Sequence, residues 1–110
     1  MSRSIPERDW KQLRNLKPEL LDTLCERIHI QAESIIKSTV KSEHEKYLDL
    51  FKHIQDSDDV VARCFNDWRR SNISMKIGQL IAEDLLTDEH IQNLTAETKE
   101  IIESWRSFPK

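Results

Sequence analysis

The sequence contains one glycine, three prolines and two cysteines among its 110 residues. Because glycine and dipeptides such as Asn-Gly supply the turns between strands, their scarcity argues against a β-sheet. A single glycine also excludes the glycine-rich phosphate loops of the usual nucleotide-dependent enzymes. No apolar run approaches the roughly 20 residues that span a bilayer, and the N-terminus has no apolar leader segment. These absences favour an all-α protein in the cytoplasm that makes no membrane contact.

The composition is that of one domain covering residues 1–110. Hydrophobic residues make up 37% and charged residues 34% of the chain, and the formal net charge is −3. A chain of this length can bury roughly two-thirds of its unfolded surface around a single core. The near-balance of charge provides no global field for nucleic acid, although the first seventeen residues are basic and the stretch from Glu83 to Glu103 is acidic.

The prolines and helix-capping residues predict a compact antiparallel bundle of about five to six helices. Pro6 and Pro18 are each followed by glutamate, which matches the first turn of a helix, where proline needs no N–H partner. Ser42 and Glu45 have the spacing of a capping box. Short connections indicate that consecutive helices are antiparallel neighbours. The predicted helices are 6–16, 18–40, 42–55, 57–86, 87–94 and one that begins at 95.

Apolar stripes in two of these helices predict core positions. In the helix 18–40 the stripe consists of Leu21, Leu24, Cys25, Ile28, Ala32, Ile35, Ile36 and Val40. In the helix 42–55 it consists of Tyr47, Leu48, Phe51 and Ile54. Cys25 and Cys64 are therefore expected to be buried, reduced thiols.

The stretch from Phe65 to Ala82 is predicted to be the central helix, because its second half is apolar on more than one side. A break or kink near Arg70–Asn72 is the alternative left open. Its small residues Ser71, Ser74, Gly78 and Ala82 recur every three or four positions and form one narrow groove. Glycine inside a helix costs about 0.5–1 kcal/mol relative to alanine. Gly78 therefore indicates the close approach of another helix, either in the same chain or in a second copy.

Three arginines beside Trp68 are the strongest candidates for ligand contact. Arg63, Arg69 and Arg70 carry planar guanidinium groups, which hold phosphates, carboxylates or bases when an aromatic ring is near. Asp67 offers a local ion pair at helical spacing, so a structural role is favoured over a ligand site. Arg70 is expected to pair with Asp67 and to be partly buried.

No motif has the spacing that metal or nucleophilic chemistry requires. Glu26 and His29 fit Glu-x-x-His, but a di-iron site needs a second such motif, which is missing. Cys25 lies one turn from His29, yet apolar surroundings raise the pKa of a thiol, the opposite of what a reactive cysteine needs. We predict no catalytic residue, no metal and no cofactor.

Segments spread along nearly the whole chain resemble a family of short, uncharacterised bacterial proteins. These segments are Ile5–Trp10, Leu16–Leu20, Cys25–Arg27, Ser42–Leu48, Arg69–Ser71, Leu85–Glu89 and Glu97–Thr98. Where that family often has Phe-Ser, this chain has Leu94-Thr95, which keeps an apolar residue and a hydroxyl cap. Members are sometimes described as binding proteins of peptide transporters, but the absent export signal argues against that role here. The resemblance implies an all-α bacterial protein and implies no activity.

These features favour a non-enzymatic protein-interaction or regulatory module that forms a homodimer or binds a protein partner. Trp10, Trp105 and Phe108 lie near the chain ends, where full burial in one small domain is difficult. The alternative is a nucleic-acid-binding accessory protein that uses Arg63, Arg69, Arg70 and the basic N-terminus, with an affinity that falls steeply with salt. The predicted interaction residues are Trp68, Arg69, Arg70, Ser71, Ser74, Gly78 and Ala82.

Overall fold

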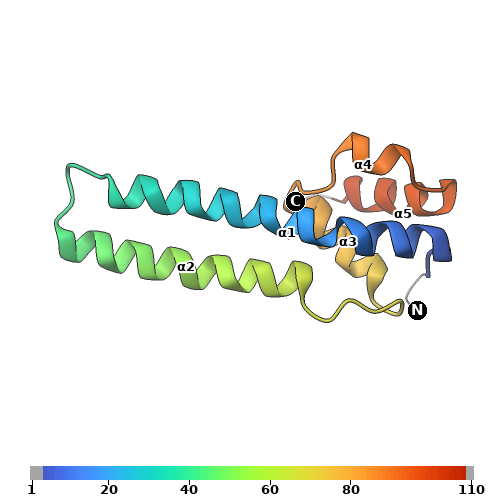
Figure 1. Ribbon diagram of the computed structural model, residues 1–110, viewed down its shortest axis with the longest axis horizontal. Helices are drawn as coiled ribbons and strands as arrows, with labels where there is room; N and C mark the ends of the chain where they lie inside the picture. Colours follow the sequence, from blue (N-terminus) through green and yellow to red (C-terminus); the bar gives the residue numbers. More distant parts are fainter. Residues whose placement is uncertain (1–3, 109–110) are drawn as a thin grey trace.

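The computed structural model describes residues 4–108, which form five helices and no strand. The helices are α1 (Glu7–Ile36), α2 (Glu43–Phe65), α3 (Ile73–Ala82), α4 (Asp88–Gln92) and α5 (Ala96–Arg106). The predicted all-α helical bundle is therefore confirmed. In Figure 1, α1 and α2 form a long antiparallel hairpin, and the three short helices gather around the N-terminal half of α1.

The first helix does not end at Pro18 as predicted, because α1 continues through this residue to Ile36. Proline in a helix interior removes one hydrogen bond and costs about 3 kcal/mol. The pyrrolidine ring of Pro18 is exposed, whereas Leu13 and Leu20 on either side of it are buried in the core. Packing on both sides of Pro18 therefore holds together a helix that the local sequence would divide.

The predicted boundary at Ser57 is also wrong, and the true break comes later. α2 continues through Asp56–Asp58 and ends at Phe65. The predicted central helix is interrupted by residues 66–72, which include the segment Arg70–Asn72 where the sequence left a break open, and Asp67 in this segment has a φ of 59°. The Asn72 side chain accepts a hydrogen bond from the Arg69 N–H and donates one to the Asp67 carbonyl. Such local bonds compete with the helix and stop it.

The hydrophobic core lies in the part of the molecule that contains α3, α4, α5 and the N-terminal half of α1, which we call the body. α3 supplies its centre with three side chains that are fully buried, Ile73, Ile77 and Leu80. The remaining core residues are Ile5, Leu13, Leu20, Leu24, Cys64, Phe65, Leu85, Leu86, Ile91, Leu94, Ile101 and Ile102. The second half of the predicted central helix is thus correctly placed in the core, except for Met75 and Ala82, which are exposed.

The rest of the hairpin projects from the body as an arm, which consists of residues 25–36 of α1, the tip 37–42 and residues 43–63 of α2 (Figure 1). The radius of gyration is 16.7 Å, whereas a compact chain of this length has about 13 Å. The longest dimension, 52 Å, is about twice the other two, 27 and 25 Å. The body is compact as expected, but the arm makes the molecule elongated.

Candidate interaction surfaces

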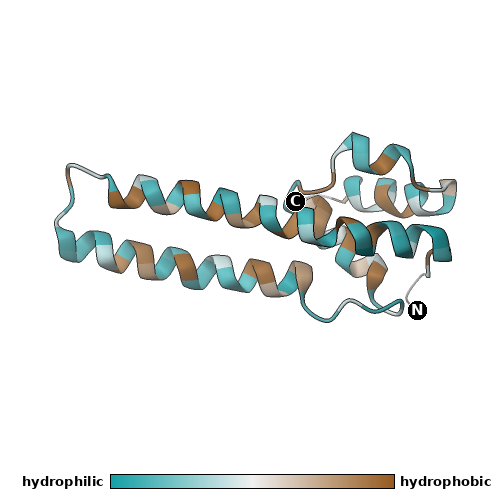
Figure 2. Cartoon of the chain, viewed as in Figure 1, coloured by the Kyte–Doolittle hydropathy of each residue, from teal (hydrophilic) through white to brown (hydrophobic). Residues whose placement is uncertain are grey.

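The arm has no buried residue. Every side chain from Cys25 to Arg63 is exposed or half-buried, although the segment is rich in isoleucine, leucine and aromatic residues. Figure 2 shows apolar residues recurring along both helices of the arm out to its tip. Two helices alone cannot enclose a core, so the predicted burial of the stripes in 18–40 and 42–55 is wrong beyond Leu24.

On α2, three large apolar side chains lie together beside the contact with α1. The contact is marked by His53, whose Nε2 donates to the Ile28 carbonyl at 2.9 Å. Ile54 follows His53 and is therefore turned by roughly 100° from this contact. Tyr47 and Phe51 precede Ile54 by seven and three residues, so they share its side. Their exposed fractions are 63% for Tyr47, 53% for Phe51 and 46% for Ile54.

On α1, Ile36 is the corresponding residue, and 55% of it is exposed. Ile36 follows Ile28 by eight residues, which turns it by roughly 80° around α1 from the contact at Ile28. This rotation has the same sense along the chain as the rotation from His53 to Ile54 on α2. Because the two helices are antiparallel, a turn in the same sense along each chain leads to the same side of the pair. Ile36, Tyr47, Phe51 and Ile54 thus form one surface, which we call the apolar face of the arm.

The opposite side of the arm is polar and faces α3 at its base. Arg27 donates hydrogen bonds to the carbonyls of Glu83 and Asp84 at the C-terminal end of α3, at 2.9 and 3.0 Å. Exposed charged residues continue on this side of α2 with Glu45, Lys52, Asp56, Asp59 and Arg63. The apolar face therefore points away from α3 and lies open.

Hydrogen bonds hold the tip of the arm in place. The Ser42 side chain accepts from the Glu45 N–H at 3.1 Å, and the Glu45 carboxylate accepts from the Ser42 N–H at 3.0 Å, so the predicted capping box is confirmed. This bond to the Ser42 N–H lowers the pKa of the Glu45 carboxyl below its usual 4.5. Lys41 pairs with Asp49 across the turn. The arm is therefore an ordered structural element up to its tip.

At the body, cations and tryptophans attach the loop 66–72 to α1. The guanidinium carbons of Arg14 and Arg70 lie 5.9 and 5.8 Å from the centre of the Trp10 ring. The Lys17 ammonium lies 5.0 Å from the centre of the Trp68 ring. Each contact is worth about 0.5–1 kcal/mol at an exposed site. We call these five residues the cation–tryptophan corner.

The predicted arginine site does not form as one cluster. Arg69, not Arg70, pairs with Asp67, and this contact lowers the pKa of the Asp67 carboxyl. Arg70 is exposed and pairs with Glu7 of α1, so its predicted pairing and burial are wrong. Arg63 lies apart on α2, in a depression that it shares with Asp56 and Asp59. Carboxylates thus surround or pair with all three arginines.

The predicted groove of small residues is filled largely from within the chain. Trp105 of α5 lies against Gly78, and its Nε1 donates to the Ser74 carbonyl at 2.9 Å. Ala82 is exposed beside a remaining open hollow of about 480 Å³, whereas Ser71 lies exposed in the loop before α3. The hollow is lined by Gly78, Ile81, Ala82, Asp84, Leu86, Trp105, Arg106 and Phe108.

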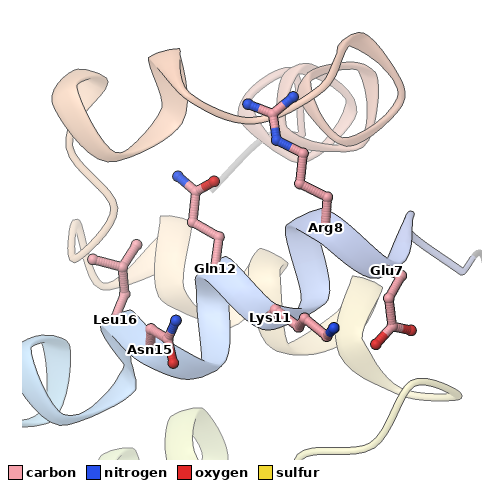
Figure 3. Close-up of a pocket in the computed structure, with 6 residues that line it drawn as sticks. All are labelled: Glu7, Arg8, Lys11, Gln12, Asn15 and Leu16. Carbon is pink, nitrogen blue, oxygen red and sulfur yellow. The ribbon is translucent and has the colours of Figure 1, made fainter.

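A second hollow lies along the first turns of α1, shown in Figure 3. All six residues that line it come from this one helix, so it is a shallow surface depression and not an enclosed cleft. Arg8 and Gln12 rise on one side, whereas Glu7 and Lys11 lie on another. The Arg8 guanidinium donates a hydrogen bond to the Asn93 carbonyl at 3.2 Å, so it already has a partner within the chain. The depression offers no converging polar groups of the kind that fix a small ligand.

The cysteines and histidines add no chemical centre. Both cysteines are free, and Cys25 is only half-buried, contrary to prediction. Cys64 is buried, and this burial raises the pKa of its thiol. Within residues 4–108, no three histidine, cysteine, aspartate or glutamate side chains gather closely enough to hold a metal ion. None of the described helices is both long and apolar enough to cross a membrane.

The chain matches no protein-family model, no curated protein and no solved structure. The resemblance to a bacterial family therefore stays a prediction.

The apolar face of the arm is not predicted by the sequence analysis. The stripe of Tyr47, Phe51 and Ile54 predicts core positions, whereas these side chains are exposed in the structure. The signal that distinguishes the two is length: two helices of 30 and 23 residues extend well past helices of 10, 5 and 11 residues. The short helices cannot cover the whole hairpin.

Proposed function

We propose that this chain is a non-enzymatic, cytoplasmic protein-interaction module that self-associates through the apolar face of its arm. The observation that supports this is the complete lack of buried residues from Cys25 to Arg63, together with four half-exposed large apolar side chains on one side. Contiguous apolar patches on a soluble protein mark interaction sites. A second hairpin packed on the first would complete a four-helix bundle, in which such side chains form the core.

Sedimentation velocity on matched serine variants tests the proposal. Phe51 and Leu48 lie on the same helix and are similarly exposed, 53% and 50%. Leu48 is turned by roughly 100° from Tyr47 and roughly 120° from Ile54, so it lies outside the apolar face. Phe51→Ser should weaken self-association at least tenfold, because on the order of 100 Å² of apolar surface is lost from each copy. Leu48→Ser should leave the dissociation constant nearly unchanged.

A second matched pair on α1 extends the test. Ile36 on the apolar face and Ile30 on the outer side are 55% and 59% exposed. Ile36→Ser should weaken self-association, and Ile30→Ser should not. A wild-type protein that stays monomeric at micromolar concentration, or equal effects of both members of a pair, would refute the proposal.

Nucleic-acid binding is the second candidate function, because exposed Lys11 and Arg14 flank Trp10 on the first turns of α1. Against it, Arg14 already lies over the ring of Trp10, and a stacking base would have to displace it. Arg69 and Arg70 are both paired with acids. A gel shift at low and moderate salt tests this role, because phosphate contacts require a steep loss of affinity with salt.

A further inference from the structure

We propose that two copies associate through the apolar faces of their arms in an antiparallel two-fold arrangement, in which the tip of each arm lies against the base of the other. This inference rests on the proposed self-association. The base is the part of the arm level with Asp22 and Asp58, and the tip is 37–42. The geometry would place the two bodies at opposite ends of one four-helix bundle.

The size of the apolar face fits a second copy of the same arm. Four half-exposed side chains, of which aromatic ones bury on the order of 150–250 Å² each, offer on the order of 400 Å² of apolar surface. The half-buried side chains that border the contact between α1 and α2 add to it, among them Cys25, Ala32, Leu50 and Val61. A standard interface buries about 800 Å² per partner. A hairpin of equal length and equal apolar width covers this surface without leaving part of it exposed.

Two two-fold arrangements pack all neighbouring helices favourably, and they differ in the direction of the axis. An axis along the arm places tip on tip and body beside body. An axis across the middle of the arm, about three residues beyond Ile28 toward the tip, places tip on base. Apolar packing does not distinguish them, because both bury the same four side chains. Charge does distinguish them.

The side of the molecule that carries the apolar face is divided into blocks of charge along its length. On α1, the exposed side chains of Lys11, Arg14 and Asp22 continue the line of Ile36 toward the N-terminus at helical spacing. Glu26 lies one turn after Asp22. Glu7, one turn before Lys11, is neutralised by its ion pair with Arg70, so the body is basic on this side, and the base of the arm is acidic.

The base of α2 is acidic on the same side. Asp58 follows Ile54 by four residues and is exposed. The contact between His53 and Ile28 sets the level of the two antiparallel helices, so Asp58 lies level with the segment from Asp22 to Glu26.

The tip carries no excess charge. Glu43, an exposed acid one turn before Tyr47, pairs with Lys46, and the lysines of the tip are paired as well: Lys37 lies 2.5 Å from Glu33, and Lys41 pairs with Asp49. Both lysines are therefore compensated within the arm. The tip thus has no net charge, in contrast to the acidic base.

An axis along the arm would place the acidic base of one copy against the acidic base of the other, and the basic body surface against the basic body surface. Asp58 of one copy would then lie over Asp22 and Glu26 of the other, and the reverse contact would repeat this repulsion. The basic body surfaces with Lys11 and Arg14 would also face each other. Like charges set opposite one another oppose association.

The axis across the arm avoids these contacts. The acidic base of one copy then meets the balanced tip of the other, and the two basic surfaces lie at opposite ends. Uncharged parts of the apolar face overlap over the middle of both arms. The antiparallel arrangement is thus the one that buries the apolar face without superimposing charges of one sign.

Spin-label distances on the full chain test the arrangement. The label is attached at the tip through Thr39→Cys, in a Cys25→Ser background in which the remaining Cys64 is buried. The antiparallel arrangement predicts a tip-to-tip distance of about 25 Å or more, since Thr39 lies about eight residues beyond the axis and a helix rises 1.5 Å per residue. A mixture with a base label, Thr23→Cys, should show a tip-to-base distance shorter than the tip-to-tip distance. A dimer with tips in contact would overturn the inference and leave the self-association intact.

A charge variant provides an independent readout. Asp58→Asn removes one acid from the base, as does Asp56→Asn, the matched control on the polar side of α2. The antiparallel arrangement predicts dissociation constants for Asp58→Asn and Asp56→Asn that agree within about twofold, because neither acid faces another across the interface. Several-fold tighter association of Asp58→Asn alone would show that acids are superimposed and overturn the inference. A monomeric wild type would refute the proposed function itself.

Discussion

The indole ring of Trp105 lies directly over Gly78, at whose position a Cβ atom would be 2.5 Å from both Cδ2 and Cε2 of the ring. The ring is anchored there, because its Nε1 donates to the Ser74 carbonyl one turn earlier in α3. The only glycine of the chain thus allows α5 to approach α3. The groove predicted from the small residues is an intramolecular contact at Gly78.

Gly78→Ala should destabilise the fold, although alanine is the better helix former by about 1 kcal/mol. A rigid ring cannot yield at 2.5 Å, so overpacking should outweigh this gain and leave a net loss of about 1–3 kcal/mol. Urea denaturation followed by circular dichroism measures the loss. Trp105→Leu in the same chain removes the clash, so the double variant should lose less than the sum of the single variants. Additive losses would show that the ring moves aside freely.

Asp9→Ala should be among the most damaging single substitutions. The carboxylate is fully buried and accepts hydrogen bonds from the Thr95 N–H at 3.2 Å, the Thr95 hydroxyl at 2.5 Å and the Thr98 hydroxyl. Its removal leaves three donors without their acceptor: the buried Thr98 hydroxyl, which costs about 1–3 kcal/mol when unsatisfied, and the half-buried N–H and hydroxyl of Thr95. We expect a loss of about 3 kcal/mol or more in the free energy of unfolding. Glu7→Ala, an exposed acid in the same helical turn, is the control and should cost less than about 1 kcal/mol.

Asp84→Gly should stabilise the protein. Asp84 follows α3 with a φ of 54°, its N–H donates to the Ile81 carbonyl, and the Leu85 N–H donates to the Leu80 carbonyl. This pair of bonds is a Schellman motif, in which the left-handed residue is usually glycine. Relief of the left-handed strain should exceed the entropy that glycine adds to the unfolded chain, for a gain of about 0.5–1 kcal/mol. Asp59→Gly, inside α2, should destabilise by a similar amount. A loss in both variants would contradict the expected strain.

The local features of this chain were readable from sequence, and the long-range ones were not. Capping of α2 by Ser42 and of α4 by Thr87 follows from residues three apart. Thr95 does begin α5, but its side chain makes no cap hydrogen bond and instead donates to Asp9, 86 residues away. No local sequence pattern around Thr95 predicts Asp9 as its partner.

The same limit explains the errors at Pro18 and Asp56–Asp58. Both were read as helix ends because their intrinsic preferences disfavour helix, and in both places packing further along the chain determines the outcome. An apolar stripe such as Tyr47, Phe51 and Ile54 indicates a helix face that is buried by packing against another element. It does not indicate whether that element belongs to the same chain or to a partner.

The capping box at the tip of the arm makes the stability of the arm depend on pH. The Ser42 N–H, hydrogen-bonded to the Glu45 carboxylate, lowers the pKa of Glu45 from 4.5 in the folded state. A group whose folded-state pKa is lowered stabilises the fold at pH values above its unfolded pKa and loses this contribution as the pH falls through the folded-state value. The contribution is therefore fully present at neutral pH and is lost below pH 4.5.

Ser42→Gly tests this directly, since it removes the side-chain acceptor of the box while glycine is still tolerated as an N-cap. The Glu45 titration, followed by carboxyl-carbon NMR, should shift upward toward 4.5, because the Ser42 N–H is then held less firmly against the carboxylate. If Glu45 titrates identically in both proteins, the hydroxyl of Ser42 does not hold the box together, and the tip of the arm is ordered by Lys41 and Asp49 instead.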